Sequence, residues 1–128
     1  MEIAAEVEPS GRDGVIVAQG ASGHGYSLYL DQGHLALAIR RSSELTVIRS
    51  QDPLPAGRSH VAGVIGADGR LALRVNDKPV AEGKAGGGIE SQPADGLTVG
   101  RDGNGAVGEY VSPNPFKGRV EQARVTVQ

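Results

Sequence analysis

Hydrophobic and polar residues alternate along most of this chain. Tyr26, Leu28 and Leu30 share one phase, and Ser27, Tyr29 and Asp31 occupy the other. A period of two places successive side chains on opposite faces of a β-strand. The same alternation recurs over 35–39 and 70–75. These segments predict strands that bury one face and expose the other.

Other short apolar segments extend the series of strands. The segment 14–20, GVIVAQG, is apolar on both phases, which predicts a more central strand. The first residues of the chain also have a strand pattern. Four more segments, each bounded by turn residues, complete the series: 44–50, 60–66, 79–83 and 97–101. With the C-terminal segment, the total is about ten strands.

Turn residues separate these segments and favour antiparallel neighbours. The DQG of 31–33 and the DG of 68–69 lie between alternating segments, and the ND of 76–77 tolerates the positive φ of tight hairpins. Pro79 has no amide donor, so its strand is expected at a sheet edge. No segment has a sustained helical period, and the glycine- and proline-rich region 85–95 predicts a loop.

The C-terminal segment changes phase partway along. Phe116 and Val120 share one phase, whereas Ala123 and Val125 share the other. A strand that keeps one face buried needs an extra residue here, so we expect a β-bulge at 121–122. The complete pattern predicts an all-β fold, a two-sheet antiparallel jelly-roll sandwich with little or no helix.

Length and charge narrow the class of protein. The 128 residues are expected to form one domain over 1–128. The chain carries 13 Lys and Arg against 15 Asp and Glu, a net charge of -2, with no basic stripe. This balance argues against nucleic acid as a partner. Because the sequence starts directly on a strand, we expect the domain to be excised from or appended to a larger protein.

Composition excludes further classes. The chain has no cysteine, which rules out disulfides, thiolate zinc sites and a cysteine nucleophile. No apolar stretch approaches the roughly 18 residues that cross a bilayer, so no membrane span is predicted. The 20 Gly and 7 Pro fall as turn signals between apolar segments.

The sequence offers little for catalysis. Ser22 lies among glycines, but a nucleophile elbow needs glycine where His24 stands and a helix after it. His34 and His60 lie on other segments, without the spacing of a helical zinc site. No strand carries the alternating acids of a sandwich-fold glucanase. We therefore predict no catalytic residues and a domain that is not an enzyme.

A few side chains are candidates for ligand binding. Tyr26 and Phe116 are phased for the core, which leaves Tyr29 and Tyr110 as stacking residues for a sugar. Arg101, at a strand end, can form a bidentate pair with a carboxylate or sulfate. A structural salt bridge to a neighbouring acid is the other interpretation of Arg101, and both remain open.

The glycine-rich loop that follows Arg101 has two interpretations. It is no EF-hand, because the twelfth residue counted from Asp102 is Pro113 where a bidentate glutamate is required. Calcium sites in sandwich domains can combine backbone carbonyls with loop side chains, and Asp102, Asn104 and Glu109 could supply those. Alternatively, the polar side chains stabilise turns through local hydrogen bonds. Calcium is the one cofactor that the sequence suggests.

The order of segments resembles a known family. The pieces DGVIVAQG, GYSLYLDQGHLAL, LPAGRSHVAGVI, LRVNDKPVAEG and LTVGRDGNGAVGEYVSPNPFKGRVEQARVTV together resemble the concanavalin A-like, laminin-G-like sandwich. The C-terminal accessory domain of bacterial arylsulfatases is the most similar member, over 13–127. The resemblance implies that this domain packs against a catalytic domain. The sulfatase motif C/S-x-P-x-R is absent from this chain.

We therefore expect a non-catalytic accessory or interaction domain of a sulfatase-like hydrolase. Its partner would be the catalytic domain, another protein surface or a glycan, and its location periplasmic or extracellular if the whole protein is secreted. The expected ligand-binding residues are Arg101, Asp102, Glu109, Tyr110 and Tyr29. A calcium-assisted, lectin-like module is the alternative, followed by a sandwich-fold glycosidase or lyase.

Overall fold

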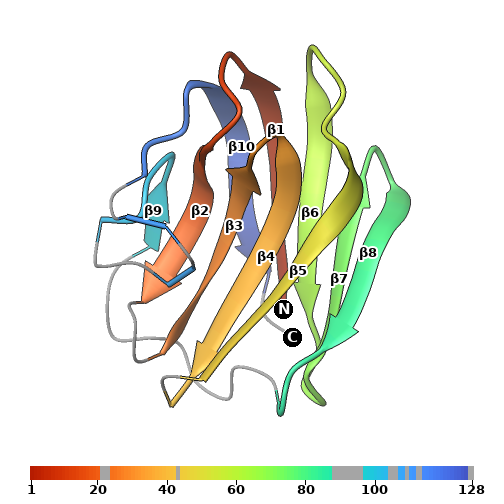
Figure 1. The fold of residues 1–128 in the computed structure, drawn as a ribbon, viewed down its shortest axis with the longest axis vertical. Helices are drawn as coiled ribbons and strands as arrows, with labels where there is room; N and C mark the ends of the chain where they lie inside the picture. Colours follow the sequence, from red (N-terminus) through yellow and green to blue (C-terminus); the bar gives the residue numbers. More distant parts are fainter. Residues whose placement is uncertain are drawn as a thin grey trace.

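The protein is an antiparallel β-sandwich (Figure 1). The computed structural model describes residues 1–20, 24–42, 44–87, 97–103, 107–108, 110–111 and 114–126. The ten named strands form two sheets of five strands each, and every pair of neighbouring strands is antiparallel. The described residues contain no helix. The predicted all-β, two-sheet jelly-roll fold is confirmed.

Each sheet draws its strands from both halves of the chain. The first sheet has the order β10 (Gly118–Thr126), β1 (Glu2–Pro9), β6 (Ser59–Ile65), β7 (Arg70–Val75) and β8 (Lys78–Lys84). The second has the order β5 (Glu44–Pro53), β4 (His34–Arg41), β3 (Gly25–Asp31), β2 (Gly14–Gly20) and β9 (Leu97–Val99). The strand pattern of the sequence located all ten, with end shifts of up to a few residues.

The hairpins use the residues that the turn chemistry favoured. Asn76 and Asp77 join β7 to β8 with φ of 51° and 67°, and Gln32 joins β3 to β4 with φ of 51°. Asparagine and aspartate tolerate this left-handed region better than most residues. Pro79 lies in β8, an edge strand of the first sheet, as its missing amide donor required.

The predicted bulge lies in β10. Ala4 pairs with Arg124 but Glu6 pairs with Glu121, so β10 has one residue more than β1 between these pairs. Gln122 has φ of 52° within this irregularity. The extra residue restores the phase, and Val120, Ala123 and Val125 all pack against the core.

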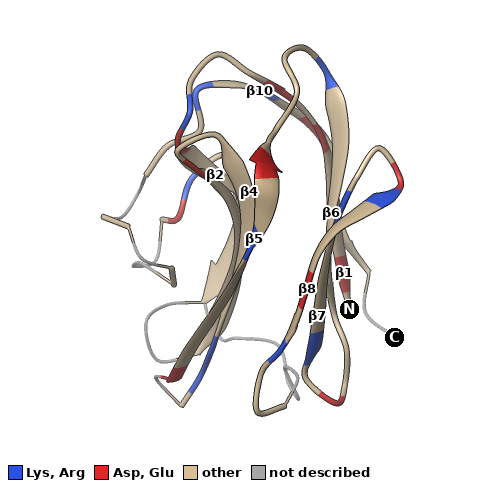
Figure 2. Cartoon of the chain, turned by 45° about the vertical axis from the view of Figure 1, so that its right-hand side comes forward, with Lys and Arg blue, Asp and Glu red and all other residues tan. Residues whose placement is uncertain are grey.

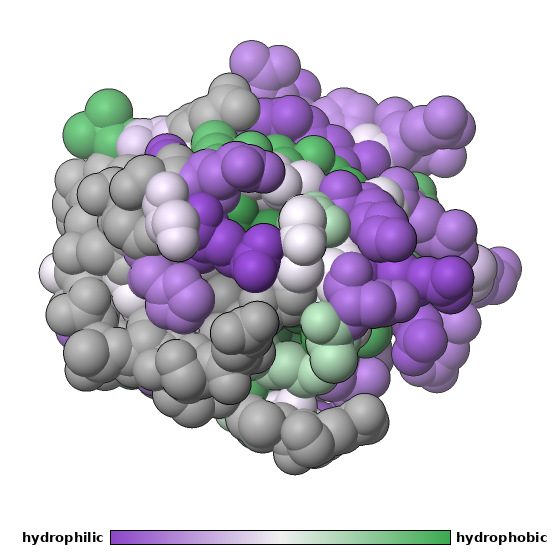
Figure 3. Space-filling model, turned by 90° about the horizontal axis from the view of Figure 1, so that it is seen from below, coloured by the Kyte–Doolittle hydropathy of each residue, from purple (hydrophilic) through white to green (hydrophobic). Residues whose placement is uncertain are grey.

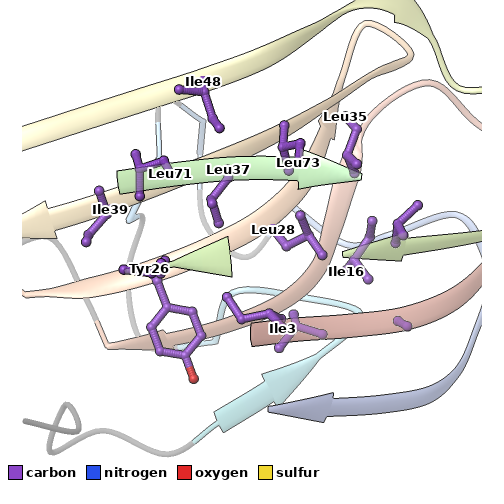
Figure 4. Close-up of a cluster of buried hydrophobic side chains, with 14 of the residues drawn as sticks. Ile3, Ile16, Tyr26, Leu28, Leu35, Leu37, Ile39, Ile48, Leu71 and Leu73 are labelled. Atoms are coloured by element: carbon purple, nitrogen blue, oxygen red, sulfur yellow. The ribbon is translucent and has the colours of Figure 1, made fainter. Parts of the chain in front are cut away.

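The main core lies between the two sheets (Figure 4). Ten of its buried side chains are Ile3, Ile16, Tyr26, Leu28, Leu35, Leu37, Ile39, Ile48, Leu71 and Leu73. Burial of each large aliphatic side chain contributes about 1.5–3 kcal/mol. The Tyr26 hydroxyl donates to Oε1 of Gln19 at 2.6 Å, and burial raises the pKa of Tyr26 to about 12.

A second apolar cluster covers the outer face of the second sheet. Val15, Ala18 and Tyr29 are buried there against Val107, which comes from the segment after β9. The alternation in β3 predicted one exposed face, and this prediction was wrong: all residues of β3 except Asp31 are buried. The reason is a tertiary contact, because Val107 and Tyr110 pack over this face.

The outer face of the first sheet is polar. Lysine, arginine, aspartate and glutamate alternate along its strands and adjoining turns (Figure 2). No second apolar cluster of described residues lies on that side. Among the described residues, no helix has the length and apolarity to cross a membrane.

Candidate functional site

The site predicted around Asp102 is a buried polar cluster on the outer face of the second sheet. Asp102 follows β9 and is 0% exposed. Its Oδ2 accepts a hydrogen bond from the backbone amide of Val107 at 3.0 Å and lies 2.5 Å from the hydroxyl of Tyr110. A buried carboxylate requires such donors. Asp102 therefore ties the segment after β9 together from within.

The Tyr110 hydroxyl joins this segment to the sheet. It lies 2.8 Å from Oγ of Ser27, in the middle of β3. A phenol carries one proton, so Tyr110 donates to the Asp102 carboxylate and accepts from the Ser27 hydroxyl. Burial, together with the hydrogen bond to Asp102, raises the pKa of Tyr110 well above its usual range. The phenol is held neutral as a donor.

The two tyrosines expected to stack on a sugar stack on each other. The ring centroids of Tyr29 and Tyr110 are 5.0 Å apart at an interplanar angle of 70°, an edge-to-face contact. Tyr29 is 1% exposed, so its ring is not the surface platform that the alternation in β3 suggested. Gly108 permits this packing, because a Cβ there would lie 2.7 Å from the Tyr110 ring.

Small residues make room for the cluster. Ser27 pairs with Ala18 in β2 and with Ala38 in β4, and both alanines are fully buried. Nε of Arg40, two residues beyond Ala38 on the same face, donates to the carbonyl of Val107 at 2.6 Å. Val107 and Tyr110 are thus bonded to the sheet at Arg40 and Ser27, respectively.

Ser27 and Arg40 were not among the predicted site residues. Both occupy the phase of β3 and β4 that was assigned to solvent, where a polar residue needs no explanation. The available signal was the run of alanines beside them, Ala36 and Ala38, because small apolar residues on an outer face indicate that something covers it.

Arg101 is exposed. Its carbonyl accepts a hydrogen bond from Oγ1 of Thr98 at 2.6 Å, which fixes the backbone at the strand end. Within the part of the chain that the structure describes, the Arg101 guanidinium forms no ion pair. Of its two interpretations, the salt bridge to a neighbouring acid is not observed there.

Of the three predicted calcium ligands, the structure describes only Asp102. Asn104 and Glu109 lie outside the described residues, so the predicted set of three ligands is represented by Asp102 alone. Its Oδ2 is engaged by Val107 and Tyr110. Over the described ranges, no three histidine, aspartate or glutamate side chains gather in a metal-binding group. Calcium binding through backbone carbonyls of this loop stays a prediction.

The same segment carries exposed apolar side chains. Leu97 is 46% exposed and Val99 43%, both on the edge strand β9, and Val111 is 87% exposed just beyond Tyr110. They are the exposed large hydrophobic residues among those described. Figure 1 shows β9 at the edge of the second sheet. The described residues between 97 and 111 therefore combine side chains that hydrogen-bond to the sheet with exposed apolar side chains.

Fold and site together define a lectin-like β-sandwich in which Val107 and Tyr110 pack on the outer face of the second sheet. The chain belongs to the Concanavalin A-like lectin/glucanases superfamily, because a laminin-G-type model of that family matches residues 3–126. The comparison with curated proteins found no match.

Solved structures confirm the fold. Domains LG4-5 of the mouse laminin alpha1 chain align with a TM-score of 0.75 at 15% identity, covering 96% of this chain and 34% of that one. A putative carbohydrate binding protein from Bacteroides ovatus aligns with a TM-score of 0.68 at 20% identity, covering 96% of this chain and 36% of that one. The LG1-3 region of the laminin alpha2 chain aligns with a TM-score of 0.70 at 13% identity, covering 95% of this chain and 26% of that one. The chain thus spans about a third of these structures or less.

Proposed function

We propose that this chain is a non-catalytic interaction domain and that its binding face is the segment 97–111. The observation that carries the proposal is the exposure of Leu97, Val99 and Val111, on β9 and on a segment that Tyr110 ties to the sheet through its hydroxyl. Exposed apolar residues that gather on one part of a soluble domain indicate a contact with another surface. A pre-organised segment loses little entropy on binding.

The partner that we propose is the catalytic domain of a sulfatase-like hydrolase. The resemblance of 13–127 to the accessory domain of arylsulfatases supports this partner. The solved structures similar to this chain are about three to four times as long, so domains of this fold occur within larger chains. A secreted hydrolase would place the protein in the periplasm or outside the cell.

Binding to a purified hydrolase domain tests this function. The domain would be the one encoded in the same polypeptide or operon and carrying C/S-x-P-x-R. We expect a complex by calorimetry, weakened about tenfold or more by combined Leu97→Ser and Val111→Ser changes. The control is Val64→Ser, an apolar position on the other sheet. Absence of a complex, or equal weakening by Val64→Ser, would contradict the proposal.

Glycan recognition is a second candidate function. The family of the chain and the carbohydrate-binding name of the Bacteroides ovatus structure support it, and Arg101 offers an exposed guanidinium for a sulfate or carboxylate group. Calcium held by the loop after Arg101 would assist. A glycan array that includes sulfated polysaccharides tests this function, and no signal at high protein concentration removes it.

A further inference from the structure

A shallow hollow with a volume of about 530 Å³ lies across β6, β7 and β8 of the first sheet. Val64 is paired with Ala72, and Ala72 with Glu82, so these three residues form one row across the strands. Arg70 is paired with Lys84 in a parallel row. Since Leu71 and Leu73 face the core, both rows lie on the outer face of the sheet.

The floor of the hollow is apolar and its rim is polar. Val64 and Ala72 are half-buried and form the floor, whereas Asp68, Arg70 and Lys84 are exposed around it. Glu82 also lines the hollow and is exposed. Seen from below, hydrophilic residues dominate the side of the molecule on which β7 and β8 lie (Figure 3). Ligand sites commonly combine an apolar floor with a few polar groups that fix orientation.

The charges on the rim cancel. Asp68 and Glu82 supply carboxylate acceptors, and Arg70 and Lys84 supply cationic donors. A site for sulfate or phosphate would need an excess of positive charge. Equal numbers of donors and acceptors suit hydroxyl groups instead, because each hydroxyl both donates and accepts. A sugar ring adds an apolar C–H face, which matches the floor of Val64 and Ala72.

The rim is held in place by the hairpin between β6 and β7. Oδ1 of Asp68 accepts from the backbone amide of Arg70 at 3.0 Å, and the amide of Gly66 donates to the Arg70 carbonyl at 2.8 Å. The hydrogen bond from the Arg70 amide is the largest cause that lowers the pKa of Asp68. The Arg70 guanidinium lies 3.3 Å from Asp68 in an exposed ion pair, which a ligand can open at little cost.

We propose that this hollow is a binding site for a neutral saccharide. Val64 and Ala72 would support one ring face, and Asp68, Glu82, Arg70 and Lys84 would bond its hydroxyls. The proposal rests on the glycan-binding function above but places the sugar on the opposite sheet from the segment 97–111. Without an aromatic platform, the affinity for one chain is weak, with a Kd in the millimolar range.

Amide chemical shifts recorded by two-dimensional NMR test the site directly. The probes are hexasaccharides of cellulose, xylan, mannan and amylose, with a heparin hexasaccharide as the anionic comparison. We expect one of the neutral probes to shift the amides of Val64, Ala72, Glu82 and Lys84. Ala72→Leu fills the floor and should weaken binding about tenfold or more. Thr126 lies in the same row as Val64 but on β10, at the opposite edge of the sheet. The control variant Thr126→Leu should therefore change the affinity by no more than about twofold.

Each other outcome overturns the proposal in a recognisable way. Shifts confined to 97–111 that disappear in Arg101→Ala but persist in Ala72→Leu would leave glycan binding standing and remove this site. Binding of the heparin probe alone would contradict the neutral ligand. No shift with any probe at millimolar concentration would contradict the site and the glycan function together. The spectrum of each variant shows whether it is folded, and Glu82→Ala serves where Ala72→Leu does not fold.

Discussion

The hydroxyl of Tyr110 lies 2.5 Å from Oδ2 of Asp102, beneath the surface of the segment that follows β9. This pair links Asp102 and Tyr110 to the second sheet, because the same hydroxyl also bonds Ser27 in β3. The sequence left open a metal site or a plain connection here, and the two hydrogen bonds account for one oxygen of the Asp102 carboxylate, while calcium binding stays a prediction. Arg101, Leu97, Val99 and Val111 are exposed.

Replacing the phenol tests the anchor. Tyr110→Phe keeps the ring contact with Tyr29 but leaves the buried Asp102 carboxylate without one donor, so we expect a loss of about 1–3 kcal/mol in the free energy of unfolding. Urea denaturation followed by circular dichroism measures it. Tyr26→Phe, which loses one hydrogen bond to Gln19 in the core, is the matched control and should cost less. Equal stability of Tyr110→Phe and the unmodified chain would contradict the stabilising role of the hydrogen bond between Tyr110 and Asp102.

The bulge in β10 predicts an unusual response at Gln122. Its φ of 52° is strained for a β-branched residue, so Gln122→Val should destabilise by about 1–2 kcal/mol. Gln122→Gly should be neutral or stabilising, since glycine accepts this conformation. The exposed Gln51 in β5 provides the control, where valine is expected to be tolerated. Thermal melts of the three variants suffice, and a stable Gln122→Val would argue against the bulge.

Acid should weaken the first sheet through Glu6. The hydrogen bond from Nδ1 of His60 at 2.9 Å, with Arg58 nearby, holds the pKa of Glu6 below its ordinary value of 4.5. A lowered pKa contributes stability that is complete above the unfolded value and is lost as pH falls through the folded one. The unfolding free energy should therefore fall as the pH drops below about 4.5.

His60→Ala removes the main cause of this shift and should flatten the acid limb. Urea midpoints at several pH values between neutrality and pH 3 measure the slope. Thr126→Ala, on the same sheet face without a titrating group, should retain the slope of the unmodified chain. An identical acid limb in His60→Ala would show that Glu6 owes its shift to other groups.

Calcium provides a test of the loop that follows Arg101. If backbone carbonyls there hold calcium with Asp102, a calcium concentration about 100 times the Kd should stabilise the fold by about 2.7 kcal/mol. Melting temperature with millimolar calcium measures this effect, and magnesium, which prefers smaller octahedral sites, is the control. A melt that calcium leaves unchanged would remove the calcium-assisted lectin alternative.

Local patterns were sufficient for the fold. Alternation located the strands, the turn residues at 76–77 adopted the expected positive φ, and the phase change between Val120 and Ala123 located the bulge. Each of these features is encoded within a few neighbouring residues. The order of the strands in each sheet followed less directly, because β1 lies between β10, from the other end of the chain, and β6, from its middle.

The site could not be derived in the same way. Tyr110 and Ser27 are separated by 83 residues, and nothing in the pattern of β3 indicates that its outer face is covered. The alternation in β3 therefore predicted an exposed Tyr29, although Tyr29 lies in an apolar cluster. The sequence did single out Asp102 and Tyr110, but as surface ligands, because composition does not reveal the direction of a side chain.

Amide chemical-shift mapping of the complex with the hydrolase domain tests the central claim most directly. The account predicts that adding the purified domain carrying C/S-x-P-x-R shifts and broadens amides of 97–103 and 107–111, while those of β6, β7 and β8 stay in place. Perturbation spread over the first sheet with 97–111 unchanged, or no perturbation at saturating concentration, would contradict it.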